Sequence, residues 1–140
     1  MNSADSKKFV LDFFADLSAG KVDKAWESLA EDSVWDLMAK ASDYPYEHRY
    51  TKSSYRELMN ESGTKLFPNG LKFMVKKETA IAEGGLVAFE AETYGTAFNG
   101  KIYNNFYHFR VEVKNGKIQA VREYLDSGYA TEILGKRGQV

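Results

Sequence analysis

The chain of 140 residues contains no cysteine, which excludes disulfides, thiolate chemistry and thiolate metal sites. Its two histidines, His48 and His108, are too few for a metal cluster without carboxylate help, and we expect no metal and no other cofactor. With a formal net charge of −1 there is no basic stripe of the kind that binds nucleic-acid phosphates. No stretch approaches the ~18 apolar residues of a membrane span, and the polar start at Met1–Lys8 lacks a signal-peptide pattern. We therefore expect a cytoplasmic protein with neither nucleic-acid nor membrane partners.

Proline is also scarce, since only Pro45 and Pro68 occur. Hydrophobic residues make up 44% of the chain and charged residues 28%, as in ordinary soluble globular proteins. The length suits one domain with a sizeable core. We find no internal repeat and no linker that would divide the chain, so we predict a single domain over residues 1–140.

The first part of the chain has helical periodicity. Phe9, Phe13 and Leu17 recur every four residues, and the segment is bounded by Ser3 as a predicted N-cap and Gly20 as a helix stop. A short second helix follows from Val22 to Leu29, and residues 33–38 favour a strand. A third helix begins near residues 51–54, where Ser54 and Glu57 have capping-box spacing, and ends at Gly63.

The second part alternates between strands and turns. The predicted strands cover 71–82, 86–98, 102–113 and 117–126, and a short helix covers 127–134. Asn99–Gly100 and Asn115–Gly116 are strong tight-turn signals. Helices followed by a four-stranded antiparallel meander define an α+β fold. Strands of about 12 residues exceed the usual five or six and must twist, so the sheet should curl around its helices and leave a hollow.

Three stretches resemble a known family. They are 13–20 continuing into 29–36, then 100–107, and finally 115–118 continuing into 122–126. In these the chain resembles the nuclear transport factor 2-like superfamily, and within it the SnoaL-like polyketide cyclase and ketosteroid-isomerase-like branch. The resemblance implies a cone-shaped fold, in which a strongly curved, mostly antiparallel sheet wraps around three N-terminal helices. Because this fold hosts isomerases, cyclases, epoxide hydrolases, dehydratases and binding domains, it does not fix the activity.

Two aspartates are candidate general bases. By resemblance, Asp36 stands where the isomerases have their proton-abstracting aspartate, and burial near Trp35 and Met38 would raise its pKa. The alternative is a strand-end aspartate that faces water. By resemblance to SnoaL-like cyclases, Asp126 is the base of an aldol ring closure. Its alternative role is to cap the helix that begins at Ser127.

The isomerases also need a hydrogen-bond donor for the enolate oxygen. Phe13 stands where the resemblance places that donor, and loss of one such donor costs on the order of 3 kcal/mol, which argues against steroid isomerisation. Tyr107 on the long strand could act as donor instead. With Tyr103, Asn105 and Phe109 it forms one alternate face of the strand. By resemblance to the family, in which tyrosine, asparagine and tyrosine at alternate positions point inward, we assign this face to the cavity. Asn105 could alternatively bond buried backbone groups.

Phe106 and His108 fall on the opposite face of the same strand. We predict that this outer face forms a homodimer contact, because an uncovered aromatic sheet face needs covering. The alternative for His108 is a catalytic role. On the last strand Arg122, Tyr124 and Asp126 share one face, and we assign them to the site as well.

These patterns lead to three functional hypotheses. The first is an acid–base enzyme of cyclase or isomerase type acting on an apolar or aromatic carbonyl compound, the second a non-catalytic ligand- or partner-binding domain. The third, epoxide-hydrolase-like water addition, needs two aspartates bridged by arginine, and only Arg122 and Asp126 are available near the right strands. The predicted catalytic residues are Asp36, Asp126 and Tyr107. The predicted substrate contacts are Phe13, Leu17, Trp35, Met38, Tyr55, Met59, Tyr103, Asn105, Phe109, Arg122 and Tyr124.

Overall fold

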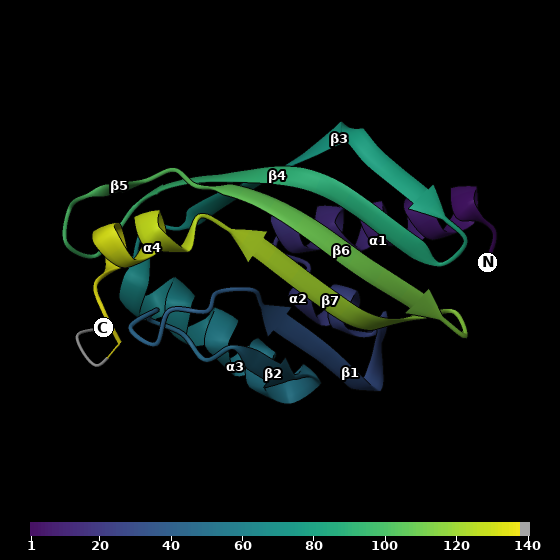
Figure 1. Ribbon diagram of the computed structural model, residues 1–140, viewed down its shortest axis with the longest axis horizontal. Coiled ribbons are helices and arrows are strands. Elements are labelled where there is room, and N and C mark those ends of the chain that lie inside the picture. Colours follow the sequence, from purple (N-terminus) through teal and green to yellow (C-terminus); the bar gives the residue numbers. More distant parts are fainter. Residues whose placement is uncertain (138–140) are drawn as a thin grey trace.

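The computed structural model describes residues 1–137, which form helices packed against one curled sheet (Figure 1). The helices are α1 (Ser3–Ser18), α2 (Val22–Trp26), α3 (Lys52–Glu61), the π-helical turn η1 (Ser62–Leu66) and α4 (Ser127–Leu134). The strands are β1 (Leu29–Leu37), β2 (Arg49–Thr51), β3 (Leu71–Glu83), β4 (Leu86–Thr96), β5 (Ile102–Tyr103), β6 (Phe106–Lys114) and β7 (Lys117–Leu125). No helix among the described residues is both long and apolar enough to cross a membrane.

The sheet combines an antiparallel meander with one parallel pairing. Its strand order is β2-β1-β7-β6-β4-β3, and β5 pairs with the end of β4. All neighbours are antiparallel except β1 and β7. The predicted meander of β3, β4, β6 and β7 is therefore confirmed, with β1 and β2 added beyond β7. At the β6–β7 hairpin, Asn115 and Gly116 both have positive φ (52° and 73°), as the Asn-Gly signal indicated.

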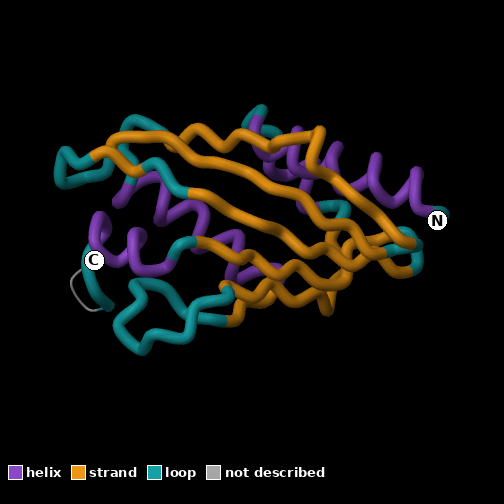
Figure 2. Tube along the Cα trace, turned by 45° about the horizontal axis from the view of Figure 1, so that its top comes forward, coloured by secondary structure: helices purple, strands orange, loops and turns teal. Residues whose placement is uncertain are grey.

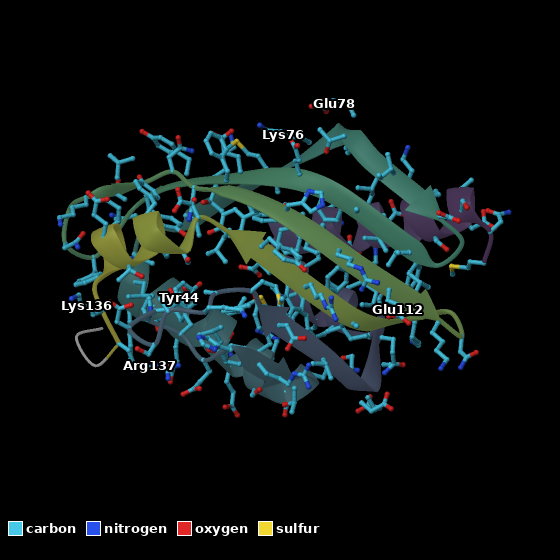
Figure 3. The ribbon with its side chains drawn as sticks, in the orientation of Figure 1. Tyr44, Lys76, Glu78, Glu112, Lys136 and Arg137 are labelled. Carbon is cyan, nitrogen blue, oxygen red and sulfur yellow. The ribbon has the colours of Figure 1, made fainter. Side chains whose placement is uncertain are left out.

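The sheet is strongly curved, and an irregularity in β3 contributes to the bend. The β3–β4 register shifts between Lys76 and Ile81. There the Thr79 hydroxyl donates to the Lys76 carbonyl (2.7 Å) and accepts from the Glu90 amide (2.9 Å), replacing ladder bonds with side-chain bonds. Lys76 and Glu78 mark this bend in Figure 3. Figure 2 shows the strands as one coiled layer, with α1 to α3 on one side of it. The predicted α+β cone is confirmed.

Several predicted boundaries are wrong in detail. Asn2, not Ser3, caps α1, because its Oδ1 accepts from the Asp5 amide at 2.8 Å. The capping box of α3 joins Thr51 and Ser54 rather than Ser54 and Glu57. Beyond α3 the chain continues as η1 instead of ending at Gly63.

The long strand predicted over 102–113 is interrupted between β5 and β6 by two asparagines. The Asn104 Nδ2 donates to the Thr93 carbonyl at 2.7 Å, and the Asn105 Oδ1 accepts from the Phe106 amide at 2.8 Å. Asparagine side chains commonly compete with the regular ladder in this way. The interruption leaves Tyr103 and Tyr107 on the same inner side.

The closed part of the cone lies where α1 crosses the sheet. Val10, Phe13 and Phe14 of α1 are at most 1% exposed. The Phe14 ring lies 4.9 Å from those of Phe89 and Phe109. Phe13 contacts the rings of Phe14, Trp26 and Trp35 and belongs to this core.

Candidate functional site

Beyond this core the cone encloses a cavity of about 320 Å³. This volume falls within the range of small-molecule sites, roughly 300–1,000 Å³. Ten aromatic and eight aliphatic side chains line it, together with Ser62, Gly63, Thr93 and Glu123. Tyr44, buried on one wall, lies at the end of the molecule that α4 occupies (Figure 3). The cavity is thus apolar with a few polar groups, the usual composition of a ligand pocket.

Half of the predicted site residues line this cavity. They are Leu17, Trp35, Tyr55, Met59, Tyr103, Tyr107 and Phe109. Those on β5 and β6 reach it because the predicted inward face of the long strand points into the cone despite the interruption.

Asp36 lies outside the cavity. On β1 its neighbours Trp35 and Leu37 point inward, so Asp36 projects from the opposite face. There it accepts two hydrogen bonds from Arg49, at 2.7 and 3.0 Å. The sequence left open whether Asp36 faces the cavity or the outside. In the structure it faces the outside, so it does not reach the candidate site.

Asp126 serves as a helix cap. It is exposed, and its Oδ1 accepts from the Tyr129 amide at 3.0 Å, at the start of α4. Arg122 and Tyr124 are exposed on the outer face of β7, and Met38, just beyond β1, is 37% exposed. The structure therefore does not bring these four residues to the cavity.

Glu123 is the carboxylate that does face the cavity, and the sequence analysis missed it. It is 9% exposed, and its Oε1 accepts hydrogen bonds from Trp35 Nε1 and the Tyr55 hydroxyl, both at 3.0 Å. Burial raises the pKa of Glu123 to about 7, although the two hydrogen bonds oppose that shift. The alternation of β7 contains a signal for this position. If apolar Val121 is placed in the core, then Glu123 and Leu125 lie on the same inward face.

Stacked rings hold the two donors in place. The Trp35 and Tyr55 rings lie 4.0 Å apart at 13°, and the Trp26 ring lies about parallel to both at 6.0 and 6.1 Å. Trp26 is itself fixed by its Nε1 bond to the Lys52 carbonyl (2.8 Å). The two hydrogen-bond donors to Glu123 are therefore held in fixed positions.

A pair of tyrosine hydroxyls forms the second polar group of the cavity. Tyr103 and Tyr107 share a hydrogen bond of 2.8 Å, and Asn105 Nδ2 donates to the Tyr103 oxygen at 2.9 Å. Burial raises the pKa of Tyr103 to about 12 and that of Tyr107 well above its ordinary value, so both remain neutral donors. Asn105 does not line the cavity. Its Nδ2 also donates to the Asp126 carbonyl (3.0 Å), so it positions Tyr103 from behind.

The site lacks the groups required by other chemistries. No basic side chain is among the described residues that line the cavity, and Glu123 is its one carboxylate. In residues 1–137, no three His, Cys, Asp or Glu side chains are grouped to hold a metal ion. Two aspartates bridged by arginine, as epoxide-hydrolase-like water addition needs, do not meet in this part of the chain.

No protein-family model and no curated protein matches the chain. Solved structures do match, at low sequence identity. One is a nuclear transport factor 2-like protein from Burkholderia xenovorans, with a TM-score of 0.78 and 17% identity over 96% of this chain and 99% of that one. Another is TerC co-crystallised with polyporic acid, with a TM-score of 0.78 and 14% identity over 92% and 97%. A third is an epoxide hydrolase of LEH-like type from M. tuberculosis, with a TM-score of 0.71 and 16% identity over 94% and 90%.

The architecture thus defines a cone-shaped α+β domain with an apolar interior pocket. More particularly, the chain has the nuclear transport factor 2-like fold, as its sequence resemblance indicated.

Proposed function

We propose that the protein binds an apolar aromatic molecule in the cavity and acts on its carbonyl group by acid–base catalysis, as a cyclase or isomerase. Glu123 is the base, in place of the aspartates considered from the sequence, and Tyr107 with Tyr103 binds the carbonyl oxygen. The observation that carries the proposal is the buried carboxyl of Glu123, with a pKa of about 7, in the same cavity as a hydrogen-bonded pair of neutral tyrosine hydroxyls. A base is most effective when its pKa lies near the working pH.

The sheet register supports this division of roles. Tyr107 pairs with Leu125, and Glu123 is two residues before Leu125 on the same face. Diagonal neighbours of this kind lie about 7–8 Å apart at their Cα atoms, and their side chains can converge on one small group. Glu123 would take a proton from the carbon beside the carbonyl, and the electron pair would move onto the oxygen held by the hydroxyls. Protonated Glu123 then returns the proton to another carbon of the enolate, or the enolate attacks a second carbonyl and closes a ring, and the new alkoxide takes the proton from Glu123.

The similar structures support the small-molecule part of this proposal. TerC was crystallised with polyporic acid, and the M. tuberculosis protein is an epoxide hydrolase. For this chain, water addition to an epoxide has the least support, because the described wall of the cavity carries no arginine.

The test is exchange of the acetyl protons of acetylnaphthalene in heavy water, followed by NMR. This reaction needs only a base and stabilisation of the enolate. The wild-type protein should accelerate exchange, and Glu123→Gln should lower the rate by at least a hundredfold, since one positioned base contributes 10²–10⁴. Tyr107→Phe should lower it about tenfold, because Tyr103 remains. Glu112→Gln, an exposed change on the outer face (Figure 3), is the matched control and should leave the rate unchanged. Equal rates in wild type and Glu123→Gln would contradict the proposal.

A non-catalytic binding domain is the second candidate. Two observations favour it. Trp35 and Tyr55 already donate hydrogen bonds to Glu123 Oε1, and the wall of the cavity is rich in aromatic side chains. In that case aromatic probes would bind and quench the tryptophan fluorescence, yet no exchange would follow.

We also propose a homodimer through the outer face of the sheet. Phe106 is 63% exposed there, and it adjoins exposed His108 and Tyr124 in a shallow groove. Light scattering after gel filtration should give twice the monomer mass for the wild type and a single monomer for Phe106→Asp. A monomeric wild type at high concentration would contradict this part.

A further inference from the structure

Three basic side chains beside the cavity wall form ion pairs on the outside of it. Arg49 reaches Asp36 at 2.7 Å, Lys52 reaches Glu31 at 3.0 Å, and Arg56 reaches Asp23 at 2.9 Å. Each of these cations stands on β2 or α3, next to the pocket wall, and each is held on the outside by an acidic partner. The described pocket wall therefore offers no positive charge to a bound molecule.

The one carboxylate among the described lining residues, Glu123, lies inside the cavity. Trp35 and Tyr55 both donate to Glu123 Oε1, and Oε2 accepts no hydrogen bond from the described residues. An ionised ligand group placed near Oε2 would meet a carboxylate in apolar surroundings, where like charges repel far more strongly than in water.

The hydroxyls of Tyr103 and Tyr107 can together donate one hydrogen bond to a ligand. The two hydroxyls share a single hydrogen bond, and Asn105 donates its N–H to Tyr103. The Thr93 hydroxyl bonds Tyr107 and lowers its pKa, as a hydrogen-bond donor does. One hydroxyl hydrogen of the pair is therefore left for an acceptor in the cavity. A single neutral donor suits a carbonyl oxygen, whereas a buried carboxylate needs several donors or a cation.

From these three observations we infer that the pocket selects ligands by charge: it accepts uncharged aromatic carbonyl compounds and excludes aromatic carboxylates. The inference rests on the proposed use of this cavity for an aromatic substrate, and it narrows that substrate class. The carbonyl oxygen lies against the tyrosine pair and its neighbouring C–H or N–H group faces Glu123 Oε2.

Three probes of nearly identical shape test the inference. Acetylnaphthalene and naphthamide are uncharged, and naphthoate has a charged oxygen in place of their methyl or amino group. Dissociation constants are measured at about pH 8 from the quenching of tryptophan fluorescence and by calorimetry. We expect the two uncharged probes to bind with similar affinity and naphthoate to bind at least tenfold more weakly. Equal or tighter binding of naphthoate, or no binding of any probe, would overturn the inference.

A charge placed on the pocket wall should reverse the selection. Met59 lines the cavity from α3, and Met59→Lys should improve naphthoate binding about tenfold, which corresponds to ~1.4 kcal/mol, and weaken acetylnaphthalene binding. The matched control is Ser53→Lys, because Ser53 is exposed on the same helix and its lysine would point into water. Circular dichroism checks that both variants fold.

Glu123→Gln gives a second and milder test, because the amide oxygen can keep the bonds from Trp35 and Tyr55. It should reduce the discrimination against naphthoate several-fold. Unchanged discrimination in both Met59→Lys and Glu123→Gln would overturn the inference. The proposed catalysis fails separately: if acetylnaphthalene binds selectively but its protons do not exchange faster, charge selection stands and the enzyme hypothesis falls.

Discussion

The central strands β4, β6 and β7 differ sharply between their two halves. In one half their inward residues are apolar and closely packed, as with Val87, Phe89, Val111 and Val121, all at most 1% exposed. In the other half the same inward face of β7 carries Glu123 and lines a cavity. One sheet thus combines a packed half with a hollow half, and the polar groups sit where packing stops.

This difference explains how the fold tolerates the buried carboxyl of Glu123. A charge in a fully packed core costs several kcal/mol, and the protein avoids part of that cost by raising the pKa of Glu123. The packed half must then supply most of the stability. Four predictions test this division, in order of decreasing effect on the free energy of unfolding.

Phe89→Ala in the packed half should have the largest effect. Phe89 is fully buried and stacks on Phe109 at 5.3 Å, so removal of its ring should lower the free energy of unfolding by about 3–5 kcal/mol. Urea denaturation measures the change, with Tyr107→Phe in the hollow half as the comparison. A smaller loss for Phe89→Ala than for Tyr107→Phe would break the distinction between the halves.

Glu123 should make stability depend on pH. Its pKa is raised from 4.5 to about 7 in the folded state, so between these values the folded protein holds a proton that the unfolded chain has lost. The stability is therefore fully present below about pH 4.5 and falls as the pH rises to about 7, by roughly 3 kcal/mol. Glu123→Gln should remove this component, whereas Glu112→Gln should keep it. Parallel pH profiles for wild type and Glu123→Gln would contradict the assignment.

Asp126→Ala should cost about 1 kcal/mol, the usual value for the loss of a helix cap. The rate of proton exchange should not change, because Asp126 lies outside the cavity. Loss of exchange in a variant that still binds acetylnaphthalene would return Asp126 to the list of catalytic candidates.

Asp36→Asn should have the smallest effect, less than about 1 kcal/mol. Its partner Arg49 is 71% exposed, and pairs of this kind contribute little because water screens them. Thermal unfolding and the exchange assay together check the result. A hundredfold loss of exchange would show that Asp36, not Glu123, is the base.

The sequence predicted the fold well because its signals are local and repeated. The periodicity of Phe9, Phe13 and Leu17 and the Asn115–Gly116 turn depend on neighbouring residues only, and both appear in the structure. On β6, alternation around Tyr107 separated the two faces, and the family resemblance indicated which of them lines the cavity.

The base was harder to predict, since alternation defines two faces but does not say which one is inward. On β1, Trp35 and Asp36 were equally eligible, and the choice depends on β2, whose Arg49 stands beside Asp36. On β7 the predicted site residues were Arg122, Tyr124 and Asp126, which share one face, whereas Glu123 belongs to the opposite face. Its role depends on Trp35 and Tyr55, distant in the sequence, which converge on it only after folding.

The most direct test of the account is an NMR titration of the Glu123 side-chain carboxyl carbon in the protein without ligand. We expect a midpoint near pH 7, because the carboxyl is buried in an apolar cavity whose described wall carries no cation. A midpoint close to the ordinary value of about 4.3 would contradict it, since Glu123 would then be ionised and solvated like a surface residue.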